Sequence, residues 1–179
     1  MIDSINVRGK FIAIDMDGVL CDFIEGAMNL QGLMLEDFCR AAAHREKITG
    51  IKPGFELLVD MCCGEKKLWD AIEEAGESFW LDLLPTPALE FLCHAVEELV
   101  KRDLVKEFFV VSCPGRGPHG VYDGKRKWLR KHCGQQWADN LILCPSDLKV
   151  RFVANGCWLV DDKQETCEAW RTAGGKALQ

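Results

Sequence analysis

Residues 10–23 read Lys-Phe-Ile-Ala-Ile-Asp-Met-Asp-Gly-Val-Leu-Cys-Asp-Phe, and this stretch decides the fold. Its apolar part, residues 11–14, has no polar alternation, which is typical of a strand buried on both faces of a parallel sheet. Asp15 and Asp17 follow the strand, and Gly18 then breaks the pattern. Because ligands bind at the carboxyl ends of strands in open α/β sheets, we expect a site where these two carboxylates lie.

The two aspartates are separated by one residue, so in an extended chain their side chains point the same way. Two carboxylates held close together repel each other unless a cation lies between them. Carboxylate oxygens are hard ligands of the kind that Mg²⁺ prefers. The pair therefore predicts a magnesium site, although an Asp pair before a glycine also occurs in ordinary turns.

Three further apolar segments are predicted to be strands, with helices between them. The segments are residues 108–111, 141–143 and 157–160, and the helices cover about 87–102 and 123–132, with a last helix ending near 174. This alternation predicts an α/β fold with a doubly wound parallel sheet. Ser112 follows one strand, and Asp161 with Asp162 follows another. We expect these side chains to converge with Asp15 and Asp17, because the carboxyl ends of parallel strands open on one face.

The segment 24–82 contains helical patterns and nothing strand-like. Apolar residues at helical spacing predict helices at 24–48, 55–61 and 66–75, and glycine and proline residues interrupt them. We therefore divide the chain into a core domain, 1–23 and 83–179, and a small helical cap, 24–82. An insertion at this point lies over the carboxyl end of the first strand, where a lid belongs.

The composition is that of a globular protein, since 48% of the 179 residues are hydrophobic and 28% are charged. This length favours one domain with a small inserted lobe. The net charge of −6 and the lack of a basic tract argue against a surface that binds nucleic-acid phosphates. The start of the chain lacks an apolar signal region, and no apolar run reaches the roughly 18 residues of a membrane span. We expect a cytoplasmic protein with no membrane partner.

Ten cysteines are a high number for this length. No two are spaced as Cys-x-x-Cys, so a zinc site built from paired cysteines is poorly supported. Without a secretion signal, we expect reduced thiols that serve as small core residues.

Taken in order along residues 11–175, these motifs resemble those of the haloacid dehalogenase superfamily, and within it the 5'(3')-deoxyribonucleotidases. The matching motifs are Asp15-Met16-Asp17-Gly18, Ser112 after its strand, a lysine, and Leu159-Val160-Asp161-Asp162. For the lysine, Lys149 is the first choice, because it follows the 141–143 segment as in that family. Lys125, in Gly124-Lys125-Arg126-Lys127-Trp128, is the alternative.

The resemblance implies phosphoryl transfer through a carboxylate nucleophile. Asp15 would form an aspartyl-phosphate, while Asp17 protonates the leaving oxygen and later deprotonates water. Mg²⁺ would be held by Asp15, the main-chain carbonyl of Asp17 and Asp162, with Asp161 alongside. Ser112 would donate a hydrogen bond to a phosphoryl oxygen, and the lysine would neutralise the developing charge.

The resemblance also extends to substrate-binding positions. Phe23 matches the aromatic residue near the base in the deoxyribonucleotidases, and residues 79–87, which include Trp80, resemble their return from cap to core. Cys113 is a departure, because that family usually has Thr-Ser-Pro where this chain has Ser-Cys-Pro. We expect Phe23, Trp80, Cys113 and Lys125 beside the substrate.

We therefore expect a Mg²⁺-dependent phosphatase that acts on a small phosphomonoester, and the resemblance implies a nucleoside 5'-monophosphate. Three alternatives remain: a phosphatase of nucleic-acid 3' ends, a nucleotide-binding protein of this fold without activity, and a receiver-like switch. The switch would carry its phosphorylated aspartate after a middle strand, whereas Asp15 follows the first. Arg116 and His119 are expected in a loop at the same face, mainly solvated. The base, the sugar and the oligomeric state stay open.

Overall fold

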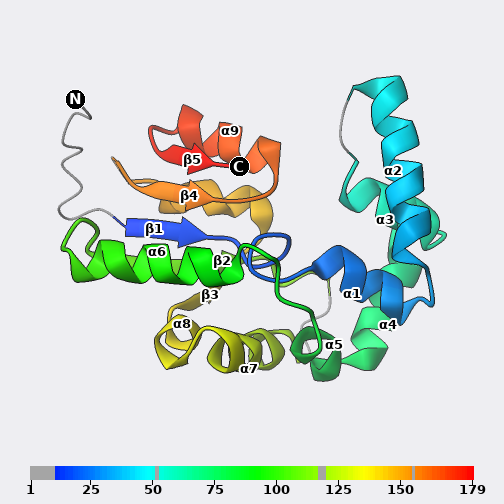
Figure 1. Ribbon diagram of the computed structural model, residues 1–179, viewed down its shortest axis with the longest axis horizontal. Helices are drawn as coiled ribbons and strands as arrows, with labels where there is room; N and C mark the ends of the chain where they lie inside the picture. The colour runs from blue at the N-terminus through cyan, green and yellow to red at the C-terminus, as the bar shows by residue number, and fades with distance from the viewer. Residues whose placement is uncertain (1–10, 51–52, 117–119, 155) are drawn as a thin grey trace.

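The computed structural model describes residues 11–50, 53–116, 120–154 and 156–179. Its centre is a sheet of five parallel strands in the order β3-β2-β1-β4-β5 (Figure 1). The strands are β1 (Phe11–Ile14), β2 (Glu107–Ser112), β3 (Leu141–Leu143), β4 (Trp158–Val160) and β5 (Lys176–Leu178). The predicted α/β fold with a doubly wound parallel sheet is confirmed.

Strand β1 lies at the middle of the sheet, since it pairs with β2 on one side and β4 on the other. The strand order changes direction beside β1, and at such a switch point the carboxyl ends of the strands form a crevice. The expectation that Asp15 does not follow a middle strand is wrong. Strand β1 is first along the chain but central in the sheet, so its position does not separate an enzyme from a phosphorylated switch.

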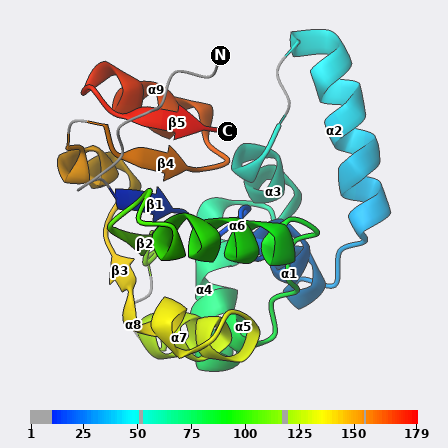
Figure 2. The same ribbon diagram turned by 60° about the vertical axis from the view of Figure 1, so that its left-hand side comes forward.

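Helices of the described segments surround this sheet. They are α1 (Phe23–Leu30), α2 (Leu35–Thr49), α3 (Phe55–Met61), α4 (Glu65–Ala75), α5 (Glu77–Leu81), α6 (Leu89–Lys101), α7 (Val121–His132), α8 (Gln135–Asp139), the 3₁₀ helix η1 (Ser146–Phe152) and α9 (Gln164–Thr172). Helices α1 to α4 lie beyond the carboxyl end of β1, and α9 lies beside β5 (Figures 1 and 2). Within these segments, no helix is both long and apolar enough to span a membrane.

Some helix boundaries differ from the prediction. The segment 24–48 forms two helices, α1 and α2, because the chain turns at Gly32, whose φ of +66° is left-handed. Asp123 does not cap α7: Gly120 precedes the helix, and Asp123 lies in its first turn. The short helix α8 was not predicted from the sequence.

The loop after β1 is hydrogen-bonded to the segment that returns from α5 to the sheet. The amide of Asp22 donates to the carbonyl of Leu84 at 2.8 Å, and the Thr86 hydroxyl donates to the carbonyl of Val19 at 2.7 Å. The chain therefore leaves the sheet and returns to it at adjoining points.

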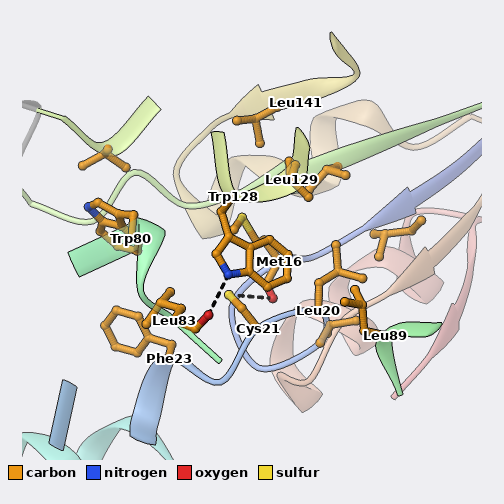
Figure 3. Packing of buried hydrophobic residues seen from close by; sticks show 14 of the residues in the cluster. Met16, Leu20, Cys21, Phe23, Trp80, Leu83, Leu89, Trp128, Leu129 and Leu141 are labelled. Atoms are coloured by element: carbon orange, nitrogen blue, oxygen red, sulfur yellow. Dashed lines mark hydrogen bonds between the residues drawn. The ribbon is translucent and has the colours of Figure 1, made fainter. Parts of the chain in front are cut away.

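Trp128 of α7 packs near Met16, Cys21 and Leu83 (Figure 3). It is fully buried in the main apolar cluster, together with Met16 and Leu20 from the loop. Its indole Nε1 donates to the carbonyl of Leu83 at 2.7 Å. A buried indole N–H needs such a partner, so Trp128 connects the returning segment to α7 by packing and by a hydrogen bond.

Candidate active site

Three acidic side chains meet at the carboxyl ends of β1 and β4, and we call them the acidic group: Asp15, Asp161 and Asp162. Their carboxylate oxygens lie within 4.8 Å of one another. The amide of Asp15 also donates to the carbonyl of Val160 at 2.8 Å, which joins the two strand ends. Asp15 and Asp161 are buried, and Asp162 is exposed. The parallel sheet thus brings these carboxylates together, as the strand ends indicate.

Lys149 lies beside two members of the acidic group. Its Nζ is 2.8 Å from an oxygen of Asp15 and 2.8 Å from an oxygen of Asp161. The side chain comes from η1 and is buried, with an exposed fraction of 1%. Because a buried ammonium group needs charged partners, Lys149 is held in place by these two carboxylates.

Burial is the largest cause of the raised pKa values of Asp15 and Asp162. It raises the pKa of Asp15 to about 7; the Lys149 ammonium opposes the rise, and the Asp161 charge adds to it. Burial, followed by the Asp161 charge, raises the pKa of Asp162 to about 6. For Lys149, burial acts to lower the pKa, but the Asp15 and Asp161 carboxylates outweigh it and raise the pKa. Three carboxylates beside one ammonium carry excess negative charge, which is unfavourable without a further cation.

The acidic group fits a divalent cation of the Mg²⁺ type, because it offers hard carboxylate oxygens around a small volume. Gly18 allows the loop after β1 to pass close to Asp162. Its φ is +83°, and a Cβ at this position would lie 2.5 Å from Oδ2 of Asp162. Any side chain at residue 18 would displace that carboxylate.

Lys125 makes a second cluster next to the first. Its Nζ contacts Asp17 Oδ2, lies 2.7 Å from the Ser112 hydroxyl and donates to the carbonyl of Cys113 at 3.0 Å. Ser112 is also 3.4 Å from Asp17 Oδ2. Lys125 is completely buried, whereas the Asp17 side chain is 21% exposed. The structure therefore places both candidate lysines at the site, each beside a different carboxylate of the Asp-x-Asp pair.

The expected aromatic residues Phe23 and Trp80 lie beside this second cluster but are buried. Their rings stack with centroids 5.9 Å apart, and their exposed fractions are 8% and 1%. The Lys125 ammonium lies 4.3 Å from the Trp80 ring centroid, so a cation already covers part of that ring. Two partly exposed rings, Phe55 and Trp69, adjoin Phe23 at 6.4 and 6.0 Å. Sequence patterns did not single out these two.

A polar bridge joins α4 to the loop after β2. Arg116 forms an ion pair with Glu65 at 2.8 Å, and the other Glu65 oxygen accepts a hydrogen bond from Trp69 Nε1 at 3.2 Å. Trp69 packs over Gly115, where a Cβ would lie 2.5 Å from the indole ring. Arg116 is thus paired rather than only solvated. His119 lies outside the described residues.

The chain is similar to known proteins in sequence and in fold. No protein-family model matches the chain. The cytosolic type of 5'(3')-deoxyribonucleotidase from Homo sapiens is 29% identical to it, over 91% of this chain and 78% of the human protein.

Two solved structures from Streptococcus pneumoniae share the fold. One, described as a hydrolase from strain TIGR4, matches 96% of this chain and 92% of its own, with a TM-score of 0.51 and 10% identity. The other, a haloacid dehalogenase-like family hydrolase, matches 94% and 82%, with a TM-score of 0.51 and 14% identity. The chain has the haloacid dehalogenase fold, and its resemblance to that superfamily is confirmed.

Proposed function

We propose that the protein is a Mg²⁺-dependent phosphomonoester hydrolase in which Asp15 is the nucleophile. One observation carries the proposal: two buried lysines hold the two carboxylates of the Asp-x-Asp pair, Asp15 and Asp17, next to the rest of the acidic group. Phosphoryl transfer depends on positioning and on neutralising charge, and this arrangement supplies both.

In the proposed reaction, a carboxylate oxygen of Asp15 bonds to phosphorus while the bond from phosphorus to the ester oxygen breaks. Asp17 gives a proton to the leaving oxygen, then takes one from the water that hydrolyses the aspartyl-phosphate. The ammonium groups of Lys125 and Lys149 balance the charge of the phosphoryl oxygens, and the Ser112 hydroxyl donates a hydrogen bond to one of them.

The acidic group is the proposed place for Mg²⁺. Asp15, Asp162 and the main-chain carbonyl of Asp17 would hold the ion, and Asp161, which Lys149 orients, would lie alongside. When bound, Mg²⁺ reduces the repulsion between an anionic nucleophile and an anionic phosphoryl group.

We propose a nucleoside monophosphate as the substrate, and the segment 24–82 as a cap over the site. Similarity to a deoxyribonucleotidase supports the substrate class. The partly exposed rings of Phe55 and Trp69, beside buried Phe23, supply flat apolar surface on which a base can pack. A cap and a net charge of −6 both favour a small molecule over a nucleic-acid end. We also propose a cytosolic location, as the human relative's name states for that protein.

The test is phosphate release from a panel of ribo- and deoxyribonucleoside monophosphates and simple phosphomonoesters, with Mg²⁺ or with EDTA. Asp15→Asn is the control, because it keeps the shape of the side chain and removes the nucleophilic charge. Release that requires Mg²⁺ and disappears in Asp15→Asn supports the mechanism. Turnover of simple esters alone would refute the nucleotide assignment, and turnover by Asp15→Asn would refute the nucleophile. If neither the panel nor the simple esters release phosphate, the result would refute the phosphatase assignment and favour the nucleotide-binding alternative.

A further inference from the structure

The ring of Trp80 lies against the ammonium group of Lys125, whose Nζ is 4.3 Å from the ring centroid. Both side chains are enclosed by the protein, with exposed fractions of 1% for Trp80 and 0% for Lys125. A cation beside the face of an indole ring is attracted to it, and the attraction is stronger when both groups are removed from water. This contact therefore favours one position of the Lys125 ammonium group.

Lys125 directs its ammonium group at three oxygen atoms of the site. They belong to the Asp17 carboxylate, the Ser112 hydroxyl and the Cys113 carbonyl. These oxygens match the three N–H donors that an ammonium group has. The four-carbon stem of a lysine is flexible, so hydrogen bonds at its end do not by themselves fix its path. The Trp80 ring supplies a contact of a different kind, from another helix.

Helix α5, which carries Trp80, lies very close to α7, which carries Lys125. A Cβ at Gly124, the residue before Lys125, would lie 2.7 Å from the Cβ of Trp80 and 3.0 Å from the carbonyl oxygen of Glu77. An ion pair of 2.6 Å between Glu77 and Lys127 joins the same two helices. Because glycine has no side chain, it allows this close approach and brings Trp80 to the ammonium group.

Two further aromatic rings hold Trp80 in place. Phe23 stacks on it with ring centroids 5.9 Å apart, and Phe79 meets it edge-on at 4.9 Å (Figure 3). Aromatic pairs in these geometries are favourable beyond the area that they bury. Trp80 is thus a fixed support beside Lys125, with almost no surface open to a ligand.

We propose that Trp80 is a positioning residue that acts through Lys125 and does not contact the substrate. This inference rests on the proposed function, in which the Lys125 ammonium group balances the charge of the phosphoryl oxygens. A charge placed in advance stabilises the transition state, so displacing it slows the chemical step more than it weakens substrate binding. Trp80 therefore acts on kcat and not on the choice of base.

The first experiment measures kcat and KM for phosphate release from a nucleoside monophosphate by the wild type, Trp80→Leu and Trp80→Phe. Leucine is apolar but has no ring, and phenylalanine keeps a ring that attracts a cation less strongly. We expect kcat to fall on the order of tenfold in Trp80→Leu, and less in Trp80→Phe, with little change in KM. An unchanged kcat, with or without a rise in KM, would overturn the proposal.

Trp137→Leu is the matched control. Trp137 of α8 is also 1% exposed, but its ring lies against Phe108, with centroids 4.5 Å apart. The substitution removes the same side chain from the core at a place outside the site, so kcat should stay at the wild-type value. An equal fall of kcat in Trp137→Leu and Trp80→Leu would show that lost packing is sufficient, and would overturn the proposal.

Urea unfolding, followed by circular dichroism, tests the contact without any turnover. It compares the wild type, Trp80→Leu, Lys125→Met and the double variant, because substitutions of two residues in contact are not additive. Trp80→Leu raises the equilibrium constant of unfolding, and this factor should be smaller, on the order of tenfold, in the Lys125→Met background. Additive effects would overturn the proposal.

The two experiments separate this inference from the proposed function. A wild type that releases no phosphate would refute the function, while the unfolding measurements would still decide whether Trp80 holds Lys125. If Trp80→Leu does not fold, Trp80→Phe takes its place in the unfolding comparison, with a smaller departure from additivity expected.

Discussion

Gly18→Ala should abolish stabilisation by Mg²⁺ while lowering the stability of the metal-free protein only modestly. Gly18 has a φ of +83°, and a Cβ there would lie 2.5 Å from Oδ2 of Asp162. A left-handed backbone costs an alanine roughly 1–2 kcal/mol. The added contact is with the end of an exposed side chain, which can rotate away at little further cost. Once rotated, Asp162 no longer faces Asp15 and Asp161.

Gly50→Ala is the matched control. Gly50, at the end of α2, also has a left-handed φ, of +71°, but a Cβ there would meet no other atom of the described residues within 4 Å. Both variants should therefore lose roughly 1–2 kcal/mol of unfolding free energy without metal. Mg²⁺ at a hundred times its dissociation constant should add about 2.7 kcal/mol to the wild type and to Gly50→Ala, and nothing to Gly18→Ala.

Urea unfolding, followed by tryptophan fluorescence with Mg²⁺ or EDTA, measures all three proteins. The same Mg²⁺-dependent gain in Gly18→Ala as in the wild type would show that Asp162 does not hold the ion. Such a result would refute the assignment of the acidic group as the metal site.

Three further changes test the electrostatics and packing of the site. Lys149→Met leaves the buried carboxylates of Asp15 and Asp161 without their ammonium group, so urea unfolding at pH 8 should show a loss of about 3–5 kcal/mol in the free energy of unfolding. This loss should be smaller at pH 5, because Asp15 is protonated there. An equal loss at both pH values would contradict the ion pair. Because burial raises the pKa of Asp15 to about 7 and of Asp162 to about 6, their contribution to metal-free stability is present at low pH and lost as the pH rises from about 4 to 7. Mg²⁺ requires the deprotonated groups, so calorimetric titration should find affinity rising from pH 5 to 8, and a pH-independent affinity would count against this site. Trp128→Phe removes the buried hydrogen bond to the Leu83 carbonyl, and thermal unfolding should show a loss of about 1–3 kcal/mol in the free energy of unfolding. An unchanged melting temperature would mean that water hydrogen-bonds this carbonyl in the variant.

Local patterns were sufficient to predict four of the five strands and the meeting of the carboxylates, but not β5. The apolar runs before Asp15 and before Asp161 are short and unbroken. Parallel strands place their carboxyl ends at one edge of the sheet, so the carboxylates that follow them meet there. The helix break at Gly32 was harder to predict, because one glycine within a helical pattern is often tolerated.

The partners of the two lysines depend on contacts between distant segments. The sequence motifs suggested a choice between Lys125 and Lys149. In the structure both lie at the carboxyl edge of the sheet, Lys125 from helix α7 and Lys149 from η1. The bridge from Glu65 to Arg116 is also long-range, and no periodicity in either segment indicates it. The position of β1 in the sheet is a further case, since strand order along the chain does not give strand order in space.

The hydrogen bond from Asp22 to Leu84 has a consequence for how the chain tolerates change. The stretch between these two residues is a closed loop, and this hydrogen bond joins its two ends beside the sheet. The entropy of closing a flexible loop grows slowly, by about 0.6 kcal/mol for each doubling of its length. Lengthening or shortening this stretch away from its buried residues, such as Phe23 and Trp80, therefore changes the entropy of closing the loop little. At this junction the length of the intervening segment can change while the strands and their carboxylates keep their places.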